Sequence, residues 1–294
     1  MTRYTTATDA DREAMLAAVG VGSIKDLLAE QIPNALLLQD PLDLPEGLSE
    51  QEVYTHLAEL AAANTSAEDE VTFLGAGMYD HYVPAIVDML LGRSEFLTPY
   101  TPYQPEVSQG GLQVMFEYQT AISELTALPV SNASVYEGPS AVAAAAYLAK
   151  LVNNRKRIVV SAGVHPHTIH TLETLAVGYG QQVTVVPLKN GATDAEAWAA
   201  AIDGETSTAI VQQPNFLGAV EDVAALSEAA KAEDAGGDKL VLVGAYDPIT
   251  LGVLAPPGEV GVDVAVGEGQ TLGNRLDFGG PSFGFFAARE AFLR

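Results

Sequence analysis

The stretch RIVVSAGVHPHTIHTLETLAVGYGQQVTVVPL, residues 157–188, decides the fold of this chain. It begins and ends with short apolar runs rich in valine, which are typical of strands buried on both faces. The residues between them, 165–180, have the length and the apolar spacing of a helix. Strand, helix and strand in this order form the repeating unit of an α/β sheet.

The same alternation continues as far as residue 267. Helical patterns at 194–202 and 220–234 separate three further apolar runs, TAIVQQP (208–214), KLVLVGA (239–245) and VDVAVG (262–267). Alternation of this kind predicts a mostly parallel sheet with helices on both faces. Ligands of such sheets bind at the carboxyl ends of the strands, so the residues directly after each strand are the candidates for a site.

The part of the chain before this alternation has a different character. Helical patterns come first, and one of them begins with a capping box in which Ser49 is followed three residues later by Glu52. The later run LTPYTPYQPEVSQGG, residues 97–111, contains three prolines and cannot form a helix or a central strand, so it predicts an ordered loop. We therefore expect an N-terminal helical arm over residues 1–70 and an α/β large domain over residues 71–294.

Acidic residues far outnumber basic ones, with 38 Asp and Glu against 14 Lys and Arg and a net charge of −24. Such a surface repels nucleic acid and anionic membranes, so neither is expected as a partner. The acids are scattered, which favours a solvated surface adapted to a salt-rich, halophile-like cytoplasm over one acidic docking face. The chain has no cysteine, no secretory signal and no apolar run of ~18 residues. These features predict a cytoplasmic globular protein.

Three familiar motifs are incomplete. Gly75 and Gly77 open a glycine-rich turn, but Asp80 stands where a dinucleotide fingerprint needs its third glycine. His167 and His170 have a spacing that permits metal binding on a helix, but the start of a helix after a strand is the simpler interpretation, and no metal is expected. No GxSxG elbow is present, which argues against a serine hydrolase.

Two features point to a ligand site. A loop of small polar residues leads into an alanine-rich helix beginning near Gly138, and free N–H groups at a helix start can bind phosphate or carboxylate. An ordinary buried helix with a serine cap explains this segment equally well. In addition, Asn215, Asp247 and Glu268 each follow a different strand, which suggests one shared pocket.

Long segments of the chain resemble subunit 1 of the glycine cleavage P-protein, the alpha subunit of glycine dehydrogenase (decarboxylating). The resemblance extends over nearly the whole chain and is densest at 73–87, 95–138, QPNFLGAVED (213–222), GEGQTLG (267–273) and FGGPSFG (278–284). It implies the aspartate-aminotransferase type of pyridoxal-phosphate fold. Subunit 1 of that family is longer, so the resemblance also implies that a C-terminal small subdomain is absent here.

The resemblance further implies a division of labour between two subunits. Subunit 2 carries the lysine that binds pyridoxal phosphate covalently, and subunit 1 helps to build the site at the interface. Together they decarboxylate glycine, release CO2 and pass the aminomethyl group to the lipoyl arm of the H-protein. The expected partners are therefore subunit 2, lipoylated H-protein and glycine.

The lysines of the chain agree with this division. In pyridoxal-phosphate enzymes of this fold an Asp after one strand pairs with the pyridinium nitrogen, and Asp247 stands at that place. The Schiff-base lysine would be expected around residues 267–273, which contain Glu268 and Gln270, and no lysine follows Lys239. A stand-alone pyridoxal-phosphate enzyme, such as a desulfurase or an aminotransferase, is thereby disfavoured. A non-catalytic scaffold subunit remains an alternative.

The resemblance also directs attention to nine polar side chains as the lining of a shared substrate and cofactor site. Four lie in the proline-rich loop, three flank the start of the alanine-rich helix, and two follow strands. They are Tyr100, Tyr103, Glu106, Gln109, Asn132, Ser134, Glu137, Asn215 and Glu268.

Overall fold

A computed structural model describes residues 6–38, 40, 42–66, 69–97, 100–234, 239–276 and 282–293 of the chain. The chain divides into two compact units, Met1–Ser66 and Ala67–Arg294. Among the described residues, no helix is long and apolar enough to cross a membrane.

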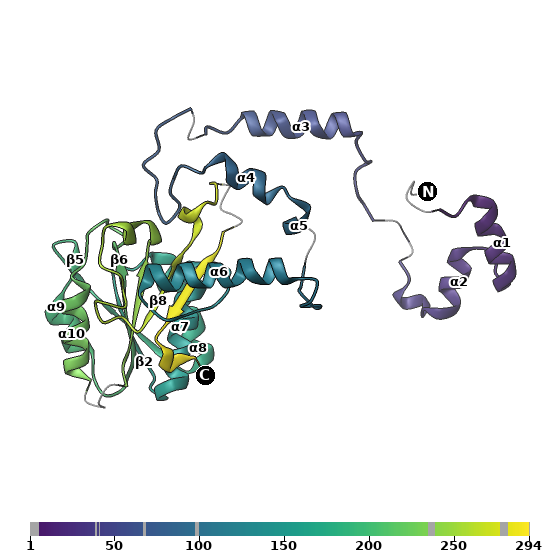
Figure 1. Cartoon of the computed structure of the whole chain (residues 1–294). Helices are drawn as coiled ribbons and strands as arrows, with labels where there is room; N and C mark the ends of the chain where they lie inside the picture. The colour runs from purple at the N-terminus through teal and green to yellow at the C-terminus, as the bar shows by residue number, and fades with distance from the viewer. Residues whose placement is uncertain are drawn as a thin grey trace. The chain divides into compact units, whose positions relative to one another are not determined.

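The first unit is helical, as the sequence predicts. It contains α1 (Asp9–Val19), α2 (Ile24–Gln31), the short 3-10 helix η1 (Asn34–Leu36) and α3 (Glu50–Ala62) (Figure 1). The capping box that begins α3 is confirmed, because the Ser49 hydroxyl accepts from the Glu52 backbone N–H and the Glu52 carboxylate accepts from the Ser49 backbone N–H. No described residue of these helices is buried, so their apolar side chains lie uncovered within this unit.

The second unit is built on a seven-stranded sheet. Five strands run parallel in the order β8-β7-β6-β2-β3; β9 pairs antiparallel with β8, and β1 pairs antiparallel with β9 at the edge. The mostly parallel sheet expected from the sequence is therefore confirmed. The strands are β1 (Val130–Ser131), β2 (Arg157–Ser161), β3 (Gln182–Val186), β6 (Thr206–Gln213), β7 (Val241–Tyr246), β8 (Val264–Glu268) and β9 (Gly284–Ala288), and a small hairpin is formed by β4 (Leu188–Lys189) and β5 (Ala192–Thr193).

Helices cover both faces of this sheet, as expected (Figure 1). Side chains alternate along each central strand, so that Val159 packs into one hydrophobic core while Ile158 and Val160 pack into the other. The first core also receives α6, α9 and α10, and the second receives α7 and α8. These helices are α6 (Gln109–Thr126), α7 (Gly138–Asn153), α8 (Pro166–Tyr179), α9 (Ala195–Ala201) and α10 (Val223–Glu233).

The proline-rich loop is shorter than predicted. The short helix α4 (Ala85–Leu91) precedes it, α5 (Ser94–Leu97) includes its first residue, and α6 begins at Gln109 and includes its last three residues. Gly110 and Gly111 therefore lie in the first turn of α6. Glycine destabilises the interior of a helix, but it is tolerated better near the end. Thr98 and Pro99 lie outside the described residues, and residues 100–108 connect the two helices through turns.

Candidate functional site

A cavity of about 620 Å³ lies at the carboxyl ends of β6, β7 and β8. Asn215, Asp247 and Glu268, which follow these strands or end them, all line it, so the shared pocket expected from the sequence is present. The starts of α7 and α8 form another part of the wall. The remaining wall is the segment 73–79, which the sequence analysis interpreted only as a glycine-rich turn.

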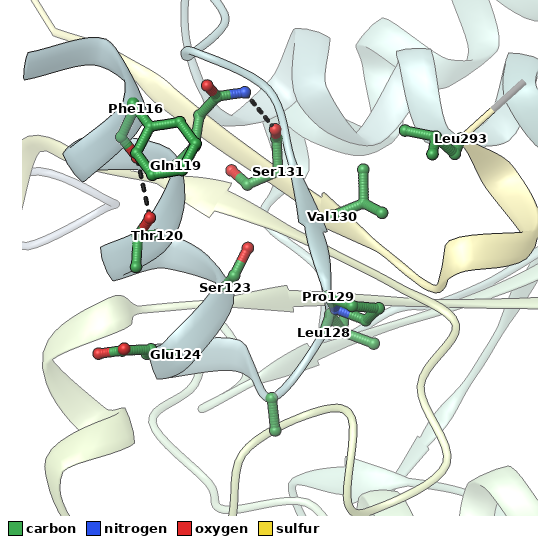
Figure 2. A pocket seen from close by; sticks show the side chains of 11 residues that line it. Phe116, Gln119, Thr120, Ser123, Glu124, Leu128, Pro129, Val130, Ser131 and Leu293 are labelled. Atoms are coloured by element: carbon green, nitrogen blue, oxygen red, sulfur yellow. Dashed lines mark hydrogen bonds between the residues drawn. The ribbon is translucent and has the colours of Figure 1, made fainter. Parts of the chain in front are cut away.

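A second hollow, of about 630 Å³, lies between α6 and the edge strand β1 (Figure 2). Two of its polar side chains are engaged with the backbone of their own chain: Gln119 Nε2 donates to Ser131 O at 2.6 Å, and Thr120 Oγ1 donates to Phe116 O at 3.0 Å. None of the nine predicted site residues lines it. The cavity at the strand ends is therefore the candidate functional site.

Asn215 organises the loop that follows β6. The residue is buried, and its Oδ1 accepts from the N–H groups of Leu217 and Ala219, both at 3.0 Å. Its Nδ2 donates to Gly191 O and to Glu221 Oε1, both at 2.8 Å. All four hydrogen-bonding positions of the amide are thus occupied. Asn215 lines the cavity, but its side chain positions the loop and has no group left over for a ligand.

Glu221 accepts a hydrogen bond from the Asn215 side chain, and this role was not predicted from the sequence. This buried carboxylate accepts from Asn215 and from both the N–H and the hydroxyl of Thr193. The Thr193 hydroxyl in turn lies 2.7 Å from that of Ser161, at the end of β2. A buried acid needs such partners, and one of them, Thr193 in β5, is 28 residues away in the sequence, so the local sequence does not predict the contact.

The start of α7 differs from the anion site considered in the sequence analysis. Glu137 and not a serine caps the helix, and its Oε2 accepts from the Ser140 N–H at 2.7 Å. Glu268 Oε2 accepts from the Gly138 N–H at 2.9 Å. Because the chain's own carboxylates take these donors, the expectation of free N–H groups at this helix start is wrong.

The segment 73–79 is held over the cavity by two side chains. His165 Nδ1 accepts from the His167 N–H at 3.0 Å, so Nε2 carries the ring proton and donates to Ala76 O at 2.8 Å. Gln270, which is fully buried, contacts both the N–H and the carbonyl of Tyr79 at 3.3 Å. Gly75, Ala76 and Gly77 all have positive φ. Glycine adopts this conformation without steric cost, and it stands at the first and third of these positions.

The structure brings only part of the predicted site together. Asn215 and Glu268 line the cavity, and Glu137 caps the helix whose residues Gly138 and Pro139 line it. The other six residues are exposed and do not line it, with Tyr100 at 98% and Tyr103 at 86% exposure. These six are Tyr100, Tyr103, Glu106, Gln109, Asn132 and Ser134.

Comparison with known proteins places the chain in a family. The sequence profile of the glycine cleavage system P-protein matches residues 2–294. The chain is 49% identical over 292 residues to a probable glycine dehydrogenase (decarboxylating) subunit 1 of Carboxydothermus hydrogenoformans, and 45% identical over 293 residues to that of Novosphingobium aromaticivorans. Each alignment covers 99% of this chain and 64% of the relative, so the chain spans about 64% of the length of these curated relatives.

Solved structures give the same result. The structure superposes on a crystal structure of glycine decarboxylase (P-protein) of the glycine cleavage system in inhibitor-bound form, with a TM-score of 0.88 and 44% identity, covering 99% of this chain and 64% of that one. Glutamate decarboxylase of Lactobacillus brevis, at 13% identity, a TM-score of 0.65 and coverage of 90% and 63%, shares the fold alone. This is the large-domain fold of pyridoxal-phosphate-dependent transferases. The chain belongs to the glycine cleavage system P-protein family.

Proposed function

We propose that this chain is subunit 1 of a two-subunit glycine dehydrogenase (decarboxylating). With a lysine-bearing subunit 2 it decarboxylates glycine, releases CO2 and transfers the aminomethyl group to the lipoyl arm of the H-protein. The subunit 1 relatives at 45–49% identity support this proposal. The observation that carries it is that no lysine lines the cavity at the strand ends, as far as the structure describes the chain.

Pyridoxal phosphate does not fit the cavity of this chain. The lining offers no lysine for a Schiff base, and the carboxylates of Glu137 and Glu268 stand at the helix start where a phosphate would need donors. Asp247 is present, but its Oδ1 already accepts from the Ile249 N–H and from the Thr271 hydroxyl. These residues favour a cofactor that subunit 2 holds covalently at the shared interface, and they disfavour a stand-alone desulfurase or aminotransferase.

The exchange of the glycine carboxyl group with labelled bicarbonate tests the proposal. The chain is mixed with a subunit 2 of this family, pyridoxal phosphate and lipoylated H-protein. We expect exchange from the mixture and none from either subunit alone, since each chain supplies part of the site. Full activity of subunit 2 alone would contradict the proposal.

The exposed tyrosines of the 100–108 turns are the proposed contribution of this chain to the shared site. The Tyr100 side chain is exposed to solvent and does not line the cavity of its own chain. A hydroxyl that orients substrate is typically worth about tenfold or more in turnover. We therefore expect Tyr100→Phe to lower kcat of the two-subunit enzyme roughly tenfold while the subunits still co-purify. Tyr54→Phe, which changes an exposed tyrosine of the first unit, is the matched control.

The scaffold alternative also has an observation in its favour. The polar groups around the cavity are largely satisfied by their own chain, as a purely structural subunit would require. The scaffold interpretation predicts full exchange activity for Tyr100→Phe and for alanine substitutions at Tyr103 and Glu106. Unchanged turnover in all three would therefore replace the shared-site proposal by a scaffold.

We also propose a salt-rich cytoplasm as the setting of this hetero-oligomeric enzyme. The basis is the net charge of −24, which makes the chain repel itself at low ionic strength. Salt at 1 M shortens the screening length to ~3 Å and relieves this repulsion. We expect the melting temperature to rise between low and molar KCl. A flat or falling melting temperature over that range would contradict the adaptation to salt.

A further inference from the structure

Three helical elements begin at the cavity, and the backbone N–H groups of their first turns are the donors that a phosphate there would use. They are α7, α8 and the 3-10 helix η2 (Pro248–Gly252), which follows β7. Ligands of α/β sheets bind at this edge, and helix starts bind phosphate because their first N–H groups lack partners within the helix. Whether this cavity accepts a phosphate therefore depends on whether these donors are free.

The first turn of α7 has no donor left. The Gly138 N–H donates to Glu268 Oε2 at 2.9 Å, the Ser140 N–H donates to Glu137 Oε2 at 2.7 Å, and Pro139 between them has no N–H. Glu268 is fixed in this position by a second contact, because its Oε1 accepts from the Ser282 hydroxyl. One carboxylate comes from the helix cap and the other from a strand 130 residues away.

The first N–H groups of α8 and η2 are likewise absent or already bonded. In α8, Pro166 has no N–H and the His167 N–H donates to the His165 ring at 3.0 Å. In η2, Pro248 has no N–H and the Ile249 N–H donates to Asp247 Oδ1 at 3.1 Å. A proline together with a side-chain cap thus removes the early donors of all three elements.

Space and charge oppose a phosphate as well. A Cβ added to Gly138 would lie 3.0 Å from the Glu268 nitrogen and 3.2 Å from the Glu268 Cβ, so the start of α7 touches the end of β8. The described lining contains Asp247 and Glu268 and neither lysine nor arginine. A phosphate dianion placed here would find no free donor in the first turns of α7, α8 and η2, and it would meet the carboxylates of Asp247 and Glu268.

We propose that Glu137 and Glu268 act as internal anions which occupy the phosphate position of this cavity and close it to phosphate-bearing ligands. The inference goes beyond the missing lysine: restoring a lysine would not by itself let a phosphorylated cofactor bind. It also does not depend on the proposed function, since it concerns binding by this chain alone.

Binding of pyridoxine 5′-phosphate and of inorganic phosphate, measured by isothermal titration calorimetry, tests the inference. Pyridoxine 5′-phosphate has no aldehyde, so it cannot react with surface lysines. The 294-residue chain should show no saturable binding of either probe. The double variant Glu137→Ala, Glu268→Ala frees two N–H donors and removes two charges, and it should bind pyridoxine 5′-phosphate at least tenfold more tightly than the unaltered chain, with one site per chain.

The matched control is Asp222→Ala, which removes the capping carboxylate of α10 outside the cavity and should gain no binding. Circular dichroism and thermal melting establish that each variant is folded. If the double variant does not fold, Glu268→Ala and Glu137→Ala are measured singly, each with a smaller gain expected. Saturable one-site binding of pyridoxine 5′-phosphate by the unaltered chain overturns the inference, and so does the absence of any gain in the folded variants.

Discussion

The Asp234→Ala variant is expected to lose about 3–5 kcal/mol of unfolding free energy, because it leaves Arg155 as a buried charge without its carboxylate. Arg155 and Asp234 form an ion pair at 2.7 Å in which the side chains are 8% and 1% exposed. The other oxygen of Asp234 accepts from the N–H groups of Lys239 and Leu240, at the start of β7. The substitution therefore breaks the pair and also frees two backbone donors.

Urea denaturation of the chain and of the variant measures this loss. Lys189→Ala removes one partner of an exposed pair, whose side chains are 61% and 91% exposed, and serves as the control. Exposed pairs contribute about 0–1 kcal/mol, so this control should stay close to the unaltered chain. Equal losses in the two variants would show that burial does not set the strength of the Arg155–Asp234 pair.

Replacing Asn215 by alanine should cost about 3 kcal/mol or more, since it removes four hydrogen bonds at once and takes one donor from the buried carboxylate of Glu221. The N–H groups of Leu217 and Ala219 and the carboxylate of Glu221 all lose their contact. Because this loop forms a wall of the cavity, its order should fall together with stability. Hydrogen exchange of residues 215–219 and the melting temperature report the two effects separately.

Asn132→Ala is the control for Asn215→Ala, because it makes the same chemical change at an exposed residue that accepts a hydrogen bond from the Ser134 N–H. It should cost well under half as much. Asn215→Asp keeps the two acceptors but places a second carboxylate beside Glu221, so it should also be strongly destabilised. If Asn215→Asp is as stable as the unaltered chain, the contact with Glu221 is not what holds the loop.

The sequence predicts the central part of the fold because that part depends on local pattern. Buried parallel strands such as β2 and β6 contain short runs of β-branched and apolar residues. Such runs are typical of strands that are covered on both faces. The edge is different: β1 has two residues, Val130 and Ser131, and exists only by pairing with Ala288 and Ala287 of β9. A two-residue strand has no periodicity, so the sequence predicts only the polar loop before the alanine-rich helix and no strand.

The position of the candidate site could be predicted from the sequence, but the hydrogen-bond partners of its side chains could not. Strand ends place Asn215 and Glu268 at one edge, and the structure agrees. Whether Glu268 faces a ligand or caps a helix depends on Gly138, 130 residues earlier in the chain. Hydrogen bonds over such distances are consequences of the tertiary fold, and residue type alone leaves both roles open.

The contact between Gln270 and Tyr79 has a consequence for how the protein can change over generations. Gln270 addresses only the main chain of Tyr79, through its N–H and its carbonyl, and it donates in addition to Asn274 O at 2.7 Å. Hydrogen bonds to backbone groups do not depend on which side chain the residue carries. A substitution at residue 79 therefore leaves both contacts with Gln270 available, whereas a substitution of Gln270 removes them together.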